Sequence, residues 1–254
     1  MHPFKYILTS YFKVRVIKNL LLKENVNQLL DIGCGAGFMI SQLDNMFKKA
    51  IGIDMSSDAI DFAKKYSNNH FITGDAQNLQ FRDCEFDSVI SIDSFEHIHD
   101  DKLAIKEVYR VLKKGGSLII YTPCIEGLFS KTKFANLYHS DKNNFMLDYR
   151  YYNKNSLENL CKDNKFKIEY IGYHNIFMQE LFTQIFKYFS SLLKKKYDNQ
   201  SDIYNFTSSP FYFIYKLFFP IIFILIRLEE IIFENIFLAK VKGHRLVIKC
   251  RKLQ

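Results

Sequence analysis

Three glycines at alternate positions form the most informative stretch of the chain. An apolar run, residues 29–32, contains Asp31 and leads directly into Gly33, Gly35 and Gly37. Glycine at these positions allows a sharp turn after a strand and lets a ligand approach where a Cβ atom would collide. We therefore predict that this loop binds a nucleotide.

The residues around the loop indicate which nucleotide it takes. A dinucleotide-binding loop has its third glycine three residues after the second, and Phe38 stands at that position. Asp31 would repel a diphosphate, whereas a carboxylate attracts an ammonium or a sulfonium group. This polarity favours S-adenosylmethionine over NAD.

The next two predicted strands also end near acidic residues. The first ends at Asp54, about 20 residues past the loop, where a carboxylate can accept both ribose hydroxyls. Met55 follows and is expected to lie against the adenine. The second strand is followed by Asp75 and Ala76, and we expect Asp75 to accept a hydrogen bond from the adenine amino group.

Groups suited to proton transfer follow the fourth predicted strand, residues 86–92. Its last residue, Ile92, is expected to line the cofactor site, and Asp93, Glu96 and His97 come next. Open parallel sheets bind their ligands at the carboxyl ends of the strands, and histidine titrates near neutral pH. We therefore assign catalytic roles to His97, as a base, and to Glu96. The alternative is a structural His97 that holds the loop after the strand.

In this order and at these strand ends, the motifs resemble those of the class I S-adenosylmethionine-dependent methyltransferases, in particular their small-molecule type 11 domain. Residues 112–120 look like the L-K-P-G-G turn of that superfamily, with Lys114 in place of proline. The resemblance covers residues 26–123. It implies an α/β fold with a doubly wound, seven-stranded, mostly parallel sheet, S-adenosylmethionine as cofactor, and methyl transfer, with an oxygen acceptor as the finer expectation.

Asp93, Glu96 and His97 also resemble the E-x-x-E-H stretch of quinone-ring O-methyltransferases, a group with a divalent-cation requirement. Two carboxylates and an imidazole could hold a hard ion that acidifies a catechol hydroxyl. Many methyltransferases with other substrates have a similar pair, and aspartate at position 93 has a shorter reach than glutamate. We therefore assign no metal ligand and leave the use of a divalent metal open.

Composition bounds the setting of the protein. Its 254 residues suffice for one catalytic domain with additions, and five scattered cysteines without a CxxC pair argue for a reducing compartment and against structural zinc. Charged residues interrupt the N-terminal apolar runs before they reach signal-peptide length, so we expect a cytoplasmic protein. The net charge of +8 suits nucleic acid or an anionic membrane surface. No Asn/Asp-Pro-Pro-Tyr/Phe motif follows the fourth strand, and we expect no nucleic-acid partner.

We predict three parts in the chain. Residues 1–25 form an N-terminal helix or lid, residues 26–173 and 243–254 form the methyltransferase domain, and residues 174–242 form a helical insertion before the last strand. Helices are predicted at residues 4–23, 38–47, 57–66, 101–112 and 154–163. Strands at residues 166–173 and 245–250 complete the predicted sheet.

The insertion is the most individual part of the sequence. Residues 211–238 are apolar apart from a narrow polar stripe, which is too few polar residues for a helix in solvent. Their longest apolar run is about half of the roughly 20 residues that a bilayer span needs. Shallow insertion into one leaflet and burial against protein, as in a homodimer, both fit. The lysines at 194–196 favour an anionic surface, so we predict peripheral membrane contact through residues 176–238 on the inner face of the membrane.

These observations lead to a functional hypothesis with alternatives. We expect a methyltransferase at the membrane surface with a small or lipid-linked acceptor, such as a prenylated quinone or a lipid-carried glycan. The aromatic residues of the segment 123–152 are expected to line the acceptor pocket. The first alternative is a soluble enzyme for small molecules or sugars, with the insertion as its dimer interface. The second is a catalytically silent scaffold that binds the cofactor.

Overall fold

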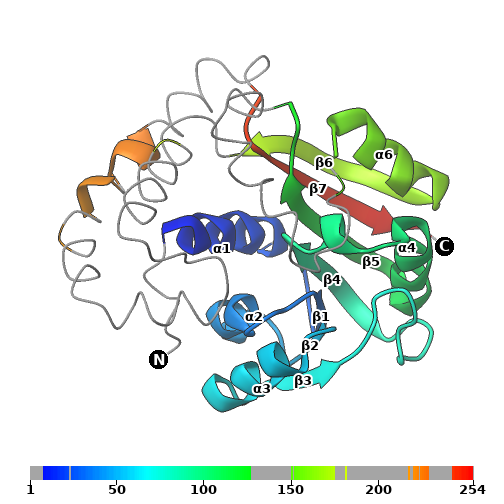
Figure 1. The fold of residues 1–254 in the computed structure, drawn as a ribbon. Helices are drawn as coiled ribbons and strands as arrows, with labels where there is room; N and C mark the ends of the chain where they lie inside the picture. The colour runs from blue at the N-terminus through cyan, green and yellow to red at the C-terminus, as the bar shows by residue number, and fades with distance from the viewer. Residues whose placement is uncertain are drawn as a thin grey trace, which may run out of the picture.

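The computed structural model describes residues 8–22, 24–126, 150, 152–174, 181, 217, 220–222, 224–228 and 242–253. In these residues the chain forms one seven-stranded sheet with helices on both faces (Figure 1). The strand order is β3-β2-β1-β4-β5-β7-β6. β1 to β5 run parallel, and β7 is antiparallel to both of its neighbours. The predicted fold class is confirmed.

The strands are β1 (Gln28–Ile32), β2 (Lys49–Asp54), β3 (His70–Thr73), β4 (Phe86–Ile92), β5 (Leu112–Pro123), β6 (Phe166–His174) and β7 (Arg245–Lys252). The helices are α1 (Leu8–Leu21), α2 (Phe38–Leu43), α3 (Ser57–Tyr66), α4 (Asp101–Val111) and α6 (Lys154–Asp163). Two short 3-10 helices, η2 (Asp44–Met46) and η3 (Phe95–His97), follow α2 and β4.

The helices cover the two faces of the sheet. Buried residues of α1, α2 and α3 pack with Leu29 and Val247 on one face, and those of α4 and α6 pack with Leu30 and Ile248 on the other. Successive side chains of a strand point to opposite faces, so each buried strand must be apolar on both sides. This requirement explains the near-continuous apolar runs of the sequence.

Most predicted boundaries agree with the structure. α3, α6 and β4 begin and end where predicted, and the hydroxyl of Ser56 caps α3 by accepting a hydrogen bond from the Ala59 N–H at 3.2 Å. α2 is shorter than predicted because the chain tightens into η2 after Leu43. The predicted helix 4–23 is described only from residue 8, as α1 ending at Leu21.

The turn that resembles L-K-P-G-G lies inside β5. The register between β4 and β5 shifts between the pairs Phe86–Leu112 and Ser88–Ser117, so the intervening residues bulge out of the ladder. Gly115 takes a φ of 75° within this bulge. Glycine is favoured there because a left-handed φ strains any residue with a Cβ atom.

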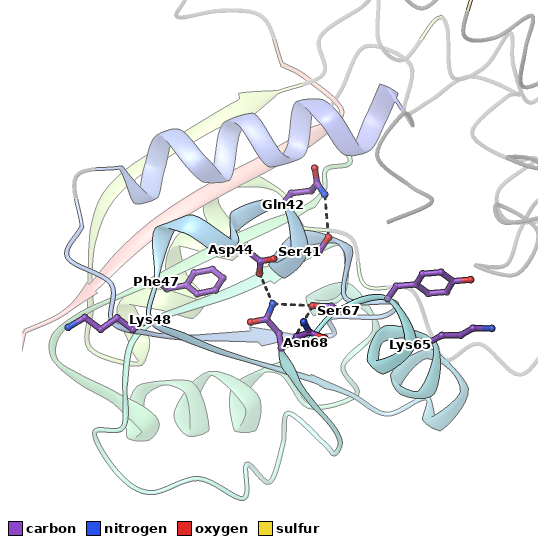
Figure 2. A pocket seen from close by; sticks show the side chains of 10 residues that line it. Ser41, Gln42, Asp44, Phe47, Lys48, Lys65, Ser67 and Asn68 are labelled. Atoms are coloured by element: carbon purple, nitrogen blue, oxygen red, sulfur yellow. Dashed lines mark hydrogen bonds between the residues drawn. The ribbon is translucent and has the colours of Figure 1, made fainter. Parts of the chain in front are cut away.

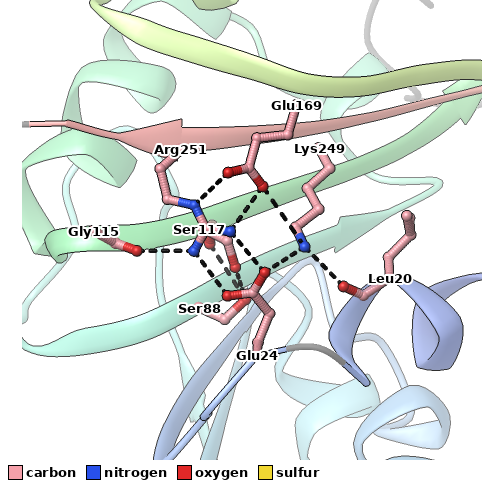
Figure 3. Close-up of polar contacts among 8 residues, drawn as sticks. All are labelled: Leu20, Glu24, Ser88, Gly115, Ser117, Glu169, Lys249 and Arg251. Atoms are coloured by element: carbon pink, nitrogen blue, oxygen red, sulfur yellow. Dashed lines mark hydrogen bonds and ion pairs between the residues drawn. The ribbon is translucent and has the colours of Figure 1, made fainter.

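A cluster of charged side chains ties the end of α1 to the last strand (Figure 3). Arg251 of β7 donates to Glu24 and to Glu169 of β6 at 2.7 Å, and Lys249 also pairs with Glu24. Lys249 donates to the Leu20 carbonyl at 2.9 Å, near the C-terminal end of α1. The hydrogen bond from Arg251 lowers the pKa of Glu24 to about 2, against the opposing effect of burial. α1 is thereby anchored to β7.

A polar hollow of about 630 Å³ lies between the C-terminal parts of α2 and α3 (Figure 2). Its lining includes Ser41, Lys48, Lys65 and Asn69, which come shortly before or after the ends of these helices. Lys48 immediately precedes β2 and Asn69 immediately precedes β3. The hollow therefore lies at the amino-terminal edge of the sheet, opposite the edge at which the glycine loop leaves β1.

The insertion is described at only a few positions. Residues 217, 220–222 and 224–228 are helical and lie within the apolar stretch 211–238, whereas Lys194–Lys196 lie outside the described residues. Five large apolar side chains, spaced as one face of a helix, are 39% to 65% exposed: Leu217, Ile221, Ile224, Leu225 and Leu228. We call these five residues the apolar stripe. In the described part of the chain, no helix has both the length and the hydropathy of a membrane span.

Candidate functional site

The glycine loop connects β1 to α2 at the carboxyl edge of the sheet. Gly33, Gly35 and Gly37 have φ angles of 69°, 49° and 73°. The Gly33 and Cys34 N–H groups donate to the Ile53 carbonyl of β2 at 2.8 Å and 3.0 Å, which holds the loop against that strand. All three glycines therefore occupy the left-handed region that a side chain disfavours, and the predicted strand-loop-helix unit is present.

Asp54 holds the middle of this loop. One of its carboxylate oxygens accepts the Gly35 N–H at 2.8 Å, and the other accepts the Ser56 N–H at 2.9 Å. Each oxygen retains a lone pair for another donor, as ribose binding would require. Met55, next in the chain, is 67% exposed at the same edge. The ribose and adenine contacts expected of these two residues remain predictions.

Asp31 is a buried carboxylate near the end of β1. Its side chain is 1% exposed, and its Oδ2 atom accepts no hydrogen bond from the described residues. Burial, followed by the negative charge of Asp54, raises the pKa of Asp31 well above its ordinary value. A buried carboxylate without a partner is costly and is stabilised by a cation. The ammonium and sulfonium groups of S-adenosylmethionine fit this requirement.

The remaining predicted cofactor residues lie at the ends of neighbouring strands. Asp75 follows β3, and its Oδ1 atom accepts the Gln77 N–H at 2.9 Å. Ala76 is buried beside it, and Ile92 is half-buried at the end of β4. The fold thus gathers these residues at the edge that carries the glycine loop, because parallel strands end on the same side.

The residues after β4 form a second, acidic part of the site. Glu96, in η3, is 1% exposed and accepts a hydrogen bond from the Thr122 hydroxyl at 3.1 Å. Burial, with a further contribution from the charge of Asp93, raises the pKa of Glu96 to about 7. Burial lowers the pKa of His97, although Asp93 opposes this effect. Near neutral pH both side chains can therefore accept a proton.

Asp93 is engaged by cationic side chains from both ends of the chain. It pairs with Lys13 of α1, and its Oδ1 atom lies 3.4 Å from Nε of Arg245 of β7. Among the residues that the structure describes, no group of three His, Cys, Asp or Glu side chains is arranged to hold a metal ion. Of the three residues considered as ligands of a divalent cation, Asp93 instead pairs with Lys13 and Arg245 in this structure.

Three contributors to this edge were not expected from the sequence: Lys13, Thr122 and Arg245. No local motif marks them, because each comes from an element whose approach to β4 depends on the completed fold. The expected acceptor loop, residues 123–152, lies outside the described residues from 127 to 149 and at 151. Its end returns to the site, since the Arg150 N–H donates to the Glu96 carbonyl at 3.0 Å.

Gly33→Ala should destabilise the protein far more than Gly115→Ala. Both glycines have a left-handed φ, but a Cβ atom at position 33 would lie 2.2 Å from Cβ of Ser94, whereas position 115 has open space. We expect losses of about 2–5 kcal/mol at position 33 and about 1–2 kcal/mol at position 115, measured by denaturant unfolding. Equal losses would show that close packing under the loop is unimportant.

Comparisons with known proteins agree with this geometry. Residues 30–120 match the family model described as a methyltransferase domain. The chain is 30% identical over 131 residues to the ubiquinone biosynthesis O-methyltransferase of Pelagibacter ubique, covering 48% of this chain and 55% of that protein. It is 33% identical over 116 residues to the demethylmenaquinone methyltransferase of Thermotoga maritima, covering 44% and 50%. The chain thus spans about half the length of these curated relatives.

A solved structure extends the similarity across the fold. Phosphoethanolamine N-methyltransferase 2 of Haemonchus contortus, in complex with S-adenosyl-L-methionine, is 21% identical with a TM-score of 0.60, over 96% of this chain and 53% of that chain. At this identity the likeness shows the fold. Together with the matched domain and the arrangement of the carboxyl edge, this likeness supports a class I S-adenosylmethionine-dependent methyltransferase domain over residues 30–120, with S-adenosylmethionine as its cofactor.

Proposed function

We propose that the protein is an O-methyltransferase that acts on a small or lipid-linked acceptor at the cytoplasmic face of a membrane. The observation that carries the proposal is the presence, at one edge of the sheet, of the buried Asp31 carboxylate, whose Oδ2 atom has no partner in the described residues, and of two proton acceptors, the buried Glu96 and the half-buried His97. The first group suits a cationic cofactor. The second suits an acceptor hydroxyl that must lose its proton.

The chemistry divides between cofactor and protein. S-adenosylmethionine supplies an electrophilic methyl group. Asp31 would hold its cationic part, and the glycine loop and Asp54 would hold the nucleoside part. Glu96 or His97 would accept the proton of the acceptor hydroxyl as its oxygen becomes the nucleophile, and the apolar surroundings would exclude water.

The relatives favour one class of acceptor. Two of them are named for ubiquinone biosynthesis and for demethylmenaquinone. A prenylated quinone precursor has an acidic ring hydroxyl that a neutral-pH base can deprotonate, and an apolar tail that needs a membrane or an apolar surface. We therefore propose a prenylated quinone as the first acceptor to test and a lipid-carried glycan as the second.

Mass spectrometry of membrane lipids and glycans provides the test. Cells with and without the gene are compared, and the proposal expects one species to differ by the mass of a methylene group. Purified protein with S-adenosylmethionine should then convert the lighter species to the heavier one. A purified protein that binds the cofactor but methylates neither quinone nor glycan fractions would contradict the proposed acceptors.

The apolar stripe supports the proposed membrane contact. Five exposed aliphatic side chains on one helical face are costly in water, and the net charge of +8 favours an anionic surface. A face of this kind would enter the outer part of one leaflet while the catalytic domain remains outside.

Liposome binding should therefore depend on the apolar stripe. We expect wild-type protein to co-sediment with vesicles of phosphatidylglycerol and phosphatidylcholine and to dissociate as salt is added. Replacing Leu217, Ile221, Ile224 and Leu228 by serine should abolish sedimentation and leave cofactor binding unchanged. The control variant carries serine at three exposed leucines elsewhere, Leu22, Leu103 and Leu253. This control should still sediment with the vesicles. Wild-type protein that stays in the supernatant as a discrete dimer would instead favour a protein interface.

A further inference from the structure

Asp93 is a point at which distant parts of the chain converge. It follows β4, its N–H donates to the Tyr121 carbonyl of β5 at 2.8 Å, and its φ is 49°. A residue with a Cβ atom adopts this left-handed backbone at an energetic cost, which neighbouring contacts must offset. The contacts of its carboxylate are therefore part of what shapes this turn.

Two cations hold that carboxylate from opposite ends of the sequence. Lys13 of α1 pairs with Oδ2, and Arg245 of β7 lies beside Oδ1. The three side chains are 21% to 24% exposed. Water and salt screen such partly buried pairs less than surface pairs. Each cation therefore offsets an appreciable part of the electrostatic effect that the negative charge of Asp93 has on nearby groups.

Asp93 in turn acts on both proton-transfer candidates. Burial is the main cause that raises the pKa of Glu96, and the charge of Asp93 raises it further, whereas Arg245 acts in the opposite direction. Burial lowers the pKa of His97, and Asp93 opposes that change. The charged groups around this pair thus come from α1, from the turn after β4 and from β7, and β5 adds the Thr122 hydroxyl.

We propose that Lys13 and Arg245 are positioning residues for the acceptor half of the reaction. They hold Asp93 in its left-handed turn and balance its charge, and so set the electrostatic environment in which Glu96 and His97 receive a proton. This inference rests on the proposed methyl transfer. It gives α1 a role in the chemistry as well as in packing, and it gives the same role to Arg245, which follows the insertion closely.

Lys13→Met provides the first test, without any acceptor. Proton NMR follows the titration of His97, identified by its loss in His97→Gln. Without the ammonium group the charge of Asp93 acts more strongly on His97, so the His97 midpoint should move up by about one pH unit. Lys13→Arg should restore the wild-type midpoint of His97. Lys18→Met, at an exposed lysine of the same helix, is the matched control and should leave it unchanged.

Asp93→Asn added to Lys13→Met separates this effect from a general change in structure. With a neutral side chain at position 93, Lys13 no longer has a charge to balance. The upward shift seen in Lys13→Met should therefore disappear in the double variant. Arg245→Gln should shift the midpoint in the same direction as Lys13→Met, and it serves as the second variant if loss of Lys13 impairs folding.

Kinetics with a methylated acceptor provide the second test. Lys13→Met should lower kcat roughly tenfold with KM for S-adenosylmethionine unchanged, and the acidic limb of kcat/KM should move to higher pH. A lower melting temperature with an unchanged His97 titration and pH profile would mean that Lys13 only holds the helix, and would overturn the proposal. Absence of any methyl transfer in the wild type would instead contradict the proposed function, while the NMR titration would still test the positioning role.

Discussion

Asp31→Asn should weaken S-adenosylmethionine binding by about 100-fold or more and should also stabilise the cofactor-free protein. In the free protein the Asp31 carboxylate is buried and its Oδ2 atom has no partner in the described residues, so its ionised form is costly. Asparagine retains the shape and removes the charge. Calorimetric titration would measure the affinity, and thermal unfolding would measure the stability.

The pH dependence of this stabilisation has a definite sign. Burial raises the pKa of Asp31 in the folded state, so between the ordinary and the raised pKa the folded protein binds more protons than the unfolded chain. Wild-type stability therefore falls as pH rises through this window, and the variant escapes this loss. The advantage of Asp31→Asn in melting temperature should be larger at about pH 8 than at about pH 5.

Asp87→Asn is the matched control for this prediction. Asp87 accepts hydrogen bonds from Lys113 at 2.8 Å and from the Asn27 and Gln28 N–H groups, and these partners lower its pKa although burial opposes them. Its replacement should destabilise the protein and leave cofactor affinity unchanged. If Asp31→Asn behaved in the same way, Asp31 would be a structural residue and the assignment of the cation site would be wrong.

Glu96→Gln and His97→Gln should each lower methyl transfer by roughly 100-fold or more with little change in cofactor affinity. Burial and the Asp93 charge raise the pKa of Glu96 to about 7, so its carboxylate is available as a base only when the pH approaches or exceeds that value. Turnover limited by Glu96 should increase with pH through about 7. Glu96→Gln should remove this dependence, because the amide does not titrate.

His99→Gln is the control for a specific role of His97. His99 is exposed two residues further on, outside the 3-10 helix that carries Glu96 and His97, and its replacement should leave turnover near the wild-type value. Loss of thermal stability in His97→Gln with unchanged turnover per folded molecule would make His97 structural. The same assay with and without EDTA tests independently whether a divalent cation takes part.

Local residue patterns were sufficient to predict much of the fold and the cofactor edge. Gly33, Gly35 and Gly37 follow an apolar run, and their left-handed conformations require the residue type that the sequence supplies. Asp31, Asp54 and Asp75 lie at or just after strand ends, and parallel strands bring such ends to one edge. These features depend on the local conformational preferences of residues and on the regular spacing of apolar residues in helices and strands. Both can be read directly from a sequence.

Contacts between residues far apart in the chain could not be predicted in this way. Lys13 and Asp93 are separated by 80 positions, and their pairing depends on how α1 lies across the sheet and on its rotation about its own axis. The approach of Arg245 to Asp93 depends equally on the register of β7 against β5. Helix rotation and strand register result from packing of the whole core, so no local pattern identifies these partners.

The electrostatic character of the site was also decided by the tertiary structure. The sequence alone identified Asp31, Glu96 and His97 as charged or titratable groups near strand ends. Burial raises the pKa values of Asp31 and Glu96 and lowers that of His97, and the charges of Asp54 and Asp93 also affect these pKa values. Desolvation and charge proximity are properties of three-dimensional position. The sequence by itself therefore determined which candidate groups stand at the strand ends, because residue type and local periodicity are written in it, and only the folded chain decided the direction of their pKa shifts and their partners.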